Sequence, residues 1–262
     1  MKIDFHTHAK LTKRIPYSQE YTKSNFRDAK LYGLDAICVT EHYDSSQVDL
    51  VYKYIHDNLE KEGDSYLFEG LRIFCGIEID IAEGGHIVAI GTLNEISDLY
   101  NDFHEQGKRK NHPTFEQLLS VIKRPFLLIG AAHPFRMEDD CLLQLNDEQI
   151  RQLDYIELSG KDIAFDKEHI EIQTRALAGR AGLPIVMGSD THQSFQYGCV
   201  YNQFKEEHTT VASLKRAVAE GAYTIVHSEF GAKQVWMASK MKKALINIYN
   251  LNGDYVSIVG CK

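Results

Sequence analysis

Short apolar runs alternate with amphipathic segments along most of the chain. Eight runs rich in aliphatic and β-branched residues predict strands over Lys2–His8, Ala36–His42, Leu71–Glu78, His86–Gly91, Pro125–His133, Asp154–Leu158, Pro184–Asp190 and Ala222–His227. Apolar residues at helical spacing predict helices over Asn25–Tyr32, Val48–Lys61, Thr114–Lys123, Asp147–Leu153, His169–Ala181 and Thr210–Glu220. Because alternating strands and helices are typical of parallel βα units, the pattern predicts an α/β fold rather than a β-sandwich or a helical bundle.

The length of the chain fits one α/β barrel or two small domains. Its 262 residues are 44% hydrophobic, which is enough for a large core. A typical TIM barrel has about 250 residues. Since no linker, repeat or low-complexity segment divides the sequence, we expect one TIM-like domain over residues 1–262. Within it, residues 235–262 are expected to form a C-terminal helix and a hairpin at the turn signal Asn252–Asp254.

Side chains of metal-ligand type occur where the predicted strands end. His6 and His8 lie one residue apart in the first run, and alternate side chains of a strand share a face, so both imidazoles can bind one ion. Later strands end in or next to further candidates, namely His42, Glu78, His133, Asp190 and His192. The active site of a TIM-like barrel lies at the C-terminal strand ends. The sequence therefore predicts a centre of imidazoles and carboxylates, which suits Zn²⁺, Mn²⁺ or Fe²⁺.

Charge and cysteine usage narrow the class of function. The formal net charge of −8 argues against a stable nucleic-acid complex, because affinity for the phosphate backbone needs clustered Lys and Arg. The five cysteines contain no CxxC pair, so neither a disulfide framework nor a thiolate zinc site is indicated. No signal peptide or bilayer-spanning apolar stretch is recognised, so we expect a cytoplasmic protein with no membrane partner.

Six motifs together resemble the PHP (polymerase and histidinol phosphatase) family. They are DFHTH at 4–8, GLDAICVTEH at 33–42, GIEI at 76–79, GHIVAIG at 85–91, AAHPFR at 131–136 and GLPIVMGSDTH at 182–192. The resemblance implies a distorted (β/α)7 barrel related to the amidohydrolase barrel, with two or three divalent metal ions.

The resemblance also implies roles for individual residues. One metal ion would be bound by His6, His8, Glu78 and Asp190, a second by Glu78, His86 and His133, and a third by His42 and His192. Asp190, His192 and His42 would also take part in catalysis. His104 and His112 lie downstream in a polar segment and are alternatives to His86, whose string matches the family better.

The chain departs from the family pattern after its second histidine. Lys13 and Arg14 stand where family members commonly place a further His or Asp. The third metal site would then be empty, weakly filled, or replaced by a cation that binds the substrate phosphate. Arg136 is a further candidate for binding that phosphate, and a surface salt bridge is the alternative.

These observations predict a metal-dependent phosphoesterase that hydrolyses a small phosphomonoester with a metal-activated hydroxide. Histidinol phosphate and phosphorylated nucleotides are candidate substrates. The rival hypotheses are a barrel amidohydrolase that cleaves a C–N bond and a metal-binding module without catalytic activity.

Overall fold

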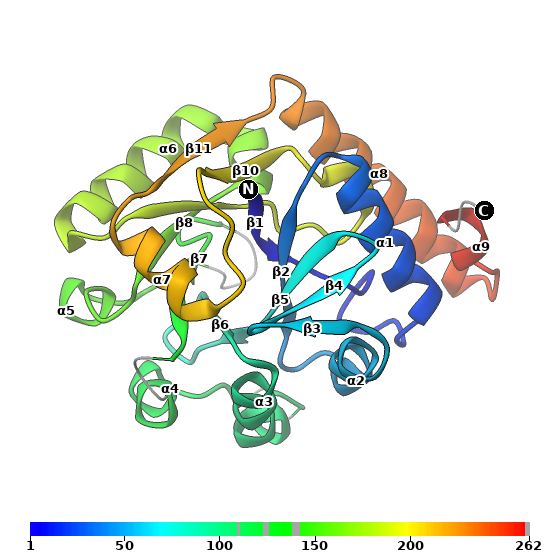
Figure 1. The fold of residues 1–262 in the computed structure, drawn as a ribbon, viewed down its shortest axis with the longest axis horizontal. Helices are drawn as coiled ribbons and strands as arrows, with labels where there is room; N and C mark the ends of the chain where they lie inside the picture. The colour runs from blue at the N-terminus through cyan, green and yellow to red at the C-terminus, as the bar shows by residue number, and fades with distance from the viewer. Residues whose placement is uncertain (109–110, 123–125, 138–141, 260–262) are drawn as a thin grey trace.

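Strands and helices alternate in the computed structural model, which describes residues 1–108, 111–122, 126–137 and 142–259 (Figure 1). The strands are β1 Lys2–Thr7, β2 Ala36–His42, β3 Glu60–Glu62, β4 Ser65–Phe68, β5 Leu71–Asp80, β6 His86–Gly91, β7 Leu128–Ala132, β8 Tyr155–Ser159, β9 Ile185–Gly188, β10 Val200–Phe204 and β11 Tyr223–His227. The helices are α1 Gln19–Leu31, α2 Val48–Asn58, α3 Leu93–Lys108, α4 Phe115–Val121, α5 Asp147–Ile150, α6 Gly160–Ala181, α7 Val211–Ala219, α8 Gly231–Asn250 and α9 Val256–Val259, with a 3₁₀ turn, η1, at Ser194–Gln196.

Nine strands form a nearly closed, distorted TIM-like barrel in the order β11-β10-β1-β2-β5-β6-β7-β8-β9, and helices surround it (Figure 1). The fold class predicted from the sequence is therefore confirmed. Two strands depart from the expected parallel βα units: β6 is antiparallel to β5 and β7, and β10 is antiparallel to β1 and β11. Residues 81–85 alone connect β5 to β6, which is too short for a parallel crossover.

Strand β1 also meets the end of β9, which brings together the two ends of the series β1-β2-β5-β6-β7-β8-β9. Two backbone hydrogen bonds join these segments at the mouth, from Asp190 N to His6 O (2.9 Å) and from His8 N to Thr191 O (2.8 Å). Deeper in the barrel, the side-chain amide of Asn202 donates to Ile3 O at 3.1 Å and to Met187 O at 2.8 Å. We call this junction the β1–β9 seam.

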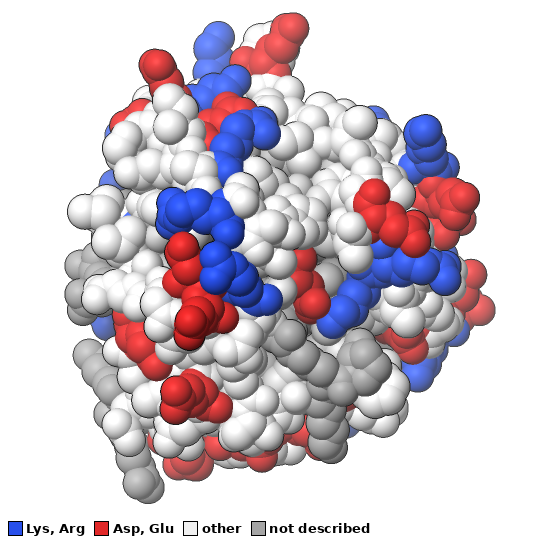
Figure 2. Space-filling view, turned by 90° about the vertical axis from the view of Figure 1, so that its left-hand side faces the viewer, with Lys and Arg blue, Asp and Glu red and all other residues white. Residues whose placement is uncertain are grey.

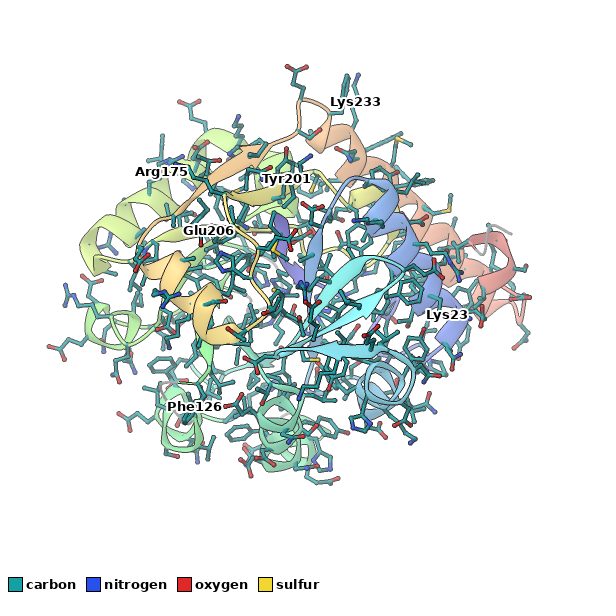
Figure 3. All side chains as sticks on the ribbon, in the orientation of Figure 1. Lys23, Phe126, Arg175, Tyr201, Glu206 and Lys233 are labelled. Atoms are coloured by element: carbon teal, nitrogen blue, oxygen red, sulfur yellow. The ribbon has the colours of Figure 1, made fainter. Side chains whose placement is uncertain are left out.

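Two apolar layers support the sheet. One lies inside the barrel, where Phe5 packs edge-on against Tyr155 and stacks on Phe204, and α7 contributes Leu214 to the same cluster. The other lies between the outer face of the sheet and the surrounding helices. The side chains in Figure 3 fill both regions, so the polar cluster described below sits on a packed base.

The C-terminal region departs from the expectation. No hairpin forms at Asn252–Asp254 in the described chain; α8 ends at Asn250 and α9 begins at Val256. Asp254 explains the difference, because its Oδ1 accepts from the backbone N–H groups of Val256 and Ser257 and so starts a helical turn. Lys123 and Pro125, where an expected helix ends and an expected strand begins, lie outside the described residues. Within the described part of the chain, none of the helices has the length and apolar character that crossing a membrane requires.

Candidate metal centre

Glu78 is the centre of a buried cluster of histidines at the mouth of the barrel. It lies on the face of β5 that also carries Phe74 and Gly76, and its side chain is fully buried. Nitrogen atoms of five imidazoles lie close to its two oxygens: His86 at 2.6 Å, His42 at 2.9 Å, His133 at 3.0 Å, His6 at 3.3 Å and His8 at 3.5 Å. These side chains come from β1 and the residue after it, from β2 and β6, and from the residue after β7, so the fold brings distant parts of the chain to one carboxylate.

A bulge in β1 turns His6 into this cluster. Ile3 and Phe5 face the interior of the barrel, so strict alternation would turn His6 outward. The register against β2 shifts between Asp4 and Thr7, which places two residues of β1 opposite one of β2. Phe5 therefore packs in the core while His6 Nε2 reaches Glu78.

The reversed direction of β6 places His86 at the mouth. His86 opens β6, and its register partners are Asp80 at the end of β5 and Ala132 at the end of β7. Because β6 runs against both neighbours, its first residue lies beside their last. His86 Nδ1 contacts Glu78, and its Nε2 lies 3.1 Å from Asp80 Oδ1.

Asp190 is the second carboxylate around which side chains gather; it lies two residues after β9 and across the β1–β9 seam from His6. Its Oδ1 lies 3.2 Å from His8 Nε2 and 3.5 Å from His192 Nδ1. Its Oδ2 lies 2.7 Å from Arg136 Nη1 and 3.6 Å from Lys161 Nζ. Asp190 therefore faces histidines on one side and cations on the other.

Two residues of the cluster have a left-handed backbone. Asp190 has a φ of 57° and His133 a φ of 30°. For residues other than glycine such conformations carry strain, of order 1–3 kcal/mol each, and they often mark functional sites. Here the strained positions direct two side chains into the cluster.

The imidazoles differ in their protonation. Burial lowers the pKa of His42 to about 4, and it lowers the pKa values of His133 and His192 well below the ordinary range. Burial acts in the same direction on His6, but the carboxylates of Glu157 and Glu78 outweigh it and hold its pKa well above the usual value. Three imidazoles are thus neutral and offer lone pairs, whereas His6 carries a proton in the absence of a competing cation.

The donor set fits metal ions. Within 4.8 Å of one another, described side chains form the groups His6–His8–Asp190, His6–Glu78–His133, His42–Glu78–His86, His8–His42–His192 and His42–Asp44–Asp80. Among the described residues, several buried donor atoms of this cluster lack a hydrogen-bond partner, namely His6 Nε2, both ring nitrogens of His8, His42 Nδ1 and Glu78 Oε2. Unsatisfied buried nitrogens and a buried carboxylate are costly unless a cation binds them, so these residues fit a metal site.

The alternatives to His86 lie elsewhere. His104, expected in a polar loop, belongs to α3, where its ring stacks on Tyr100. His112 Nδ1 lies 2.7 Å from the hydroxyl of Tyr43. Of the three histidines, the structure brings His86 into contact with Glu78.

The predicted phosphate-binding residues have different surroundings. Lys13 Nζ lies 2.9 Å from Asp44 and 3.0 Å from Asp80, within the group that includes His42. Arg14 is exposed, and no contact with the cluster is seen for it in the part of the chain that the structure describes. Arg136 is buried and contacts Asp162, Ser159 and Asp190, so it orients Asp190.

Comparison with known families supports the interpretation of the motifs. Residues 173–223 match the family model PHP_C, described as PHP-associated. The resemblance to the PHP family is confirmed. The matched PHP-associated segment runs from the second half of α6 into β11 and contains Asp190 and His192.

Solved structures share the fold. PsfC from Pseudomonas syringae PB-5123 has a TM-score of 0.74 at 20% identity, covering 93% of this chain and 98% of that chain. Endonuclease Q, in complex with a 27-mer duplex substrate with an abasic lesion at the active site, has a TM-score of 0.60 at 17% identity. The lesion-specific endonuclease PfuEndoQ from Pyrococcus furiosus has a TM-score of 0.56 at 16% identity. Each of these two alignments covers 86% of this chain but only 57% of the endonuclease chain. No curated protein sequence matches the chain.

Sequence reasoning missed several residues around the cluster. Asp80 could have been found, because it lies two residues after Glu78 and so shares its face of the strand. Lys161 lies in the first turn of α6, two residues after β8, at another C-terminal strand end. Lys242 lies in the middle of α8, where nothing in the pattern marks it. Burial lowers the pKa of Lys242 to about 8, and the carboxylate of Asp190 opposes this shift.

Proposed function

We propose that the chain is a metal-dependent phosphoesterase that hydrolyses a small phosphomonoester. The observation that carries the proposal is the convergence of five buried imidazoles on Glu78, with Asp190 beside them and unsatisfied donor atoms in the group. In the reaction, water adds across the P–O bond and yields inorganic phosphate and the free alcohol.

Two divalent ions, of Zn, Mn or Fe, would be held by His6, His8, Glu78 and Asp190 and by Glu78, His86 and His133. Bound there, such ions would acidify water and neutralise phosphoryl charge. The protein orients its ligands for this task. Glu157 accepts a hydrogen bond from His6 Nδ1 at 2.8 Å, so that Nε2 points at the centre. Arg136 holds Asp190 in the same way.

Cations beside the cluster favour a phosphoryl substrate over an amide. Lys161 Nζ lies 3.6 Å from Asp190, and Lys242 interacts electrostatically with the same carboxylate. A phosphate monoester is a dianion at neutral pH and is stabilised by such ammonium groups, whereas a neutral amide is not. This arrangement supports phosphoesterase activity over the amidohydrolase alternative.

We further propose that Lys13 takes the place of a third metal ion. Its ammonium group sits between Asp44 and Asp80, whose oxygens form a ligand-type group with His42. The positive charge of Lys13 there neutralises the same carboxylates that a third metal ion would bind. His42 and His192, both neutral, are then available to exchange protons with the substrate or water.

The surface accords with a small substrate. Figure 2 shows basic and acidic side chains interspersed over the face that carries α5 and α6, and the described part of this face has no broad basic surface. Extended contact with a phosphate backbone is favoured by gathered positive charge. We therefore expect a small phosphomonoester to be turned over faster than a nucleic-acid duplex.

Metal analysis combined with turnover tests the proposal. Purified protein is analysed for bound metal and assayed with an aryl phosphate, histidinol phosphate, a 3′-phosphorylated nucleotide and an amide substrate. Metal-dependent release of phosphate supports the proposal. Glu78→Gln should lose bound metal and turnover, whereas Glu116→Gln, which makes the same charge change at an exposed position on α4, should keep both. Metal binding without turnover would favour the non-catalytic module, and amide cleavage would favour the amidohydrolase.

A further inference from the structure

A cavity of about 740 Å³ lies beside the cluster around Glu78 and Asp190, between the segment that follows β7 and the first turns of α6. Its described wall is largely apolar and includes Phe135, Met137, Leu142, Leu143, Phe165 and Ile170. A volume of this size is typical of pockets that hold small organic ligands.

One end of the cavity meets the cluster. Arg136 and Lys161 belong to its wall, and both contact Asp190 Oδ2, at 2.7 Å and 3.6 Å. A molecule whose phosphoryl group lies at the cluster would therefore extend its remaining part along this wall. The cavity is placed to receive the alcohol portion of a phosphomonoester.

The acidic residues of the wall are engaged within the protein. Asp162 Oδ1 accepts from Arg136 Nε at 2.7 Å. Asp166 Oδ1 accepts from the backbone N–H of His169 at 3.2 Å, at a break in α6 where Asp166 has a φ of −146° and a ψ of 76°. Asp162 is thus bonded to Arg136 and Asp166 to the backbone of α6, so both carboxylates help to stabilise the wall.

Large apolar side chains are instead presented at the surface of the wall. Phe165 is 70% exposed and Met137 is 81% exposed. Exposed apolar side chains that cluster around a cavity mark binding sites more often than isolated exposed apolar side chains do. The aromatic ring of Phe165 and the thioether of Met137 are favourable contacts for a planar ring of a ligand.

We propose that this cavity binds the leaving alcohol of the substrate, and that this alcohol is an aromatic, apolar group rather than a charged or polyhydroxylated one. The inference rests on the proposed phosphoesterase activity and adds the class of substrate. Phe165 and Met137 contact the ring, while the phosphoryl group lies toward Asp190 and Lys161.

The test compares 2-naphthyl phosphate with phenyl phosphate. Both have a phenolic leaving group of similar acidity, so the ratio of their kcat/KM values reports contact with the second ring rather than bond reactivity. In Phe165→Ala this ratio should fall about threefold to tenfold, because a lost aromatic contact corresponds to that range. Met137→Ala should lower it in the same direction.

Phe126→Ala is the matched control. Phe126 is 62% exposed and lies near α4, away from α6 (Figure 3), so its removal should leave the ratio unchanged. Turnover of both substrates with an unaltered ratio in Phe165→Ala and Met137→Ala would overturn this inference and leave the proposed function standing. Absence of phosphoesterase turnover in the metal-loaded wild-type protein would overturn both.

Discussion

Glu157 contacts His6, a proposed metal ligand, and its replacement allows the effect on metal affinity to be measured apart from the effect on folding. Its Oε2 lies 2.8 Å from His6 Nδ1, while His6 Nε2 lies 3.3 Å from Glu78 and 3.9 Å from Asp190. The hydrogen bond fixes which ring nitrogen faces the cluster. We predict that Glu157→Gln weakens metal binding because the amide keeps the shape but loses the charge.

The expected magnitude follows from this contact. Loss of the group that orients a histidine ligand typically lowers metal affinity about 10- to 100-fold. An amide oxygen can still accept from Nδ1–H, so we expect about a tenfold loss for Glu157→Gln, or about 1.4 kcal/mol. Glu157→Ala removes the acceptor altogether and should approach a 100-fold loss. In the metal-free protein Glu157 faces the protonated imidazole of His6, so Glu157→Gln should also lower the stability of that fold, by about 1–3 kcal/mol.

Competition against a chromogenic chelator measures the affinity, and urea unfolding of the metal-free protein measures the stability. Glu168→Gln, which makes the same change at an exposed position of α6, is the control and should bind metal as the wild type does. Unchanged affinity in both Glu157 variants would refute the assignment of His6 as a ligand held by Glu157.

Three further predictions follow from close contacts and charges. In Gly188→Ala the new Cβ would lie 2.5 Å from His6 Cβ, so urea unfolding should show a free energy of unfolding lowered by about 1–3 kcal/mol. Gly179→Ala, where the added Cβ meets open space, should raise it by up to about 1 kcal/mol, and equal effects of the two substitutions would contradict the close packing at Gly188. Metal binding at pH 7 should release a proton from His6, whose pKa is raised, so affinity should rise with pH; calorimetry in buffers of different ionisation enthalpy checks this, and an absence of proton release would contradict it. Lys13→His removes the ammonium group that lies 3.0 Å from Asp80, so elemental analysis should find more bound metal, and unchanged metal content would contradict the idea that Lys13 replaces an ion. Higher activity of this variant would indicate that the wild-type third site is degraded, whereas lower activity would indicate that the Lys13 ammonium group serves the reaction.

Much of the strand framework could be predicted because apolar runs and their polar ends are local signals. The runs that form β1, β2, β5 and β9 were recognisable, and so were the ligand-type residues at their ends. The direction of β6 was also encoded, in the shortness of the connection 81–85, but alternation of strand and helix suggested a uniform parallel order. β10 was missed because the polar residues Asn202 and Gln203 interrupt its short apolar pattern, so that its sequence resembles a loop.

The candidate site was harder to predict where it depends on backbone geometry. The β1 bulge that turns His6 inward and the left-handed backbone of Asp190 leave no periodic signal in the sequence. Lys242, whose charge interacts with Asp190, belongs to a helix whose pattern is that of an ordinary packed helix. Such positions are set by contacts between segments far apart in the chain, and a single sequence does not display them.

The β1–β9 seam has a consequence for the lifetime of the folded protein. Ligand side chains stand on both sides of the seam, with His6 on one and Asp190 on the other, so an ion bound between them would join the first and ninth strands. Unfolding that begins by parting these strands would then have to break metal–ligand bonds before the transition state. Bound metal would slow the unfolding rate, and persistence of the fold in a cell would follow the exchange of the ion rather than its equilibrium affinity alone.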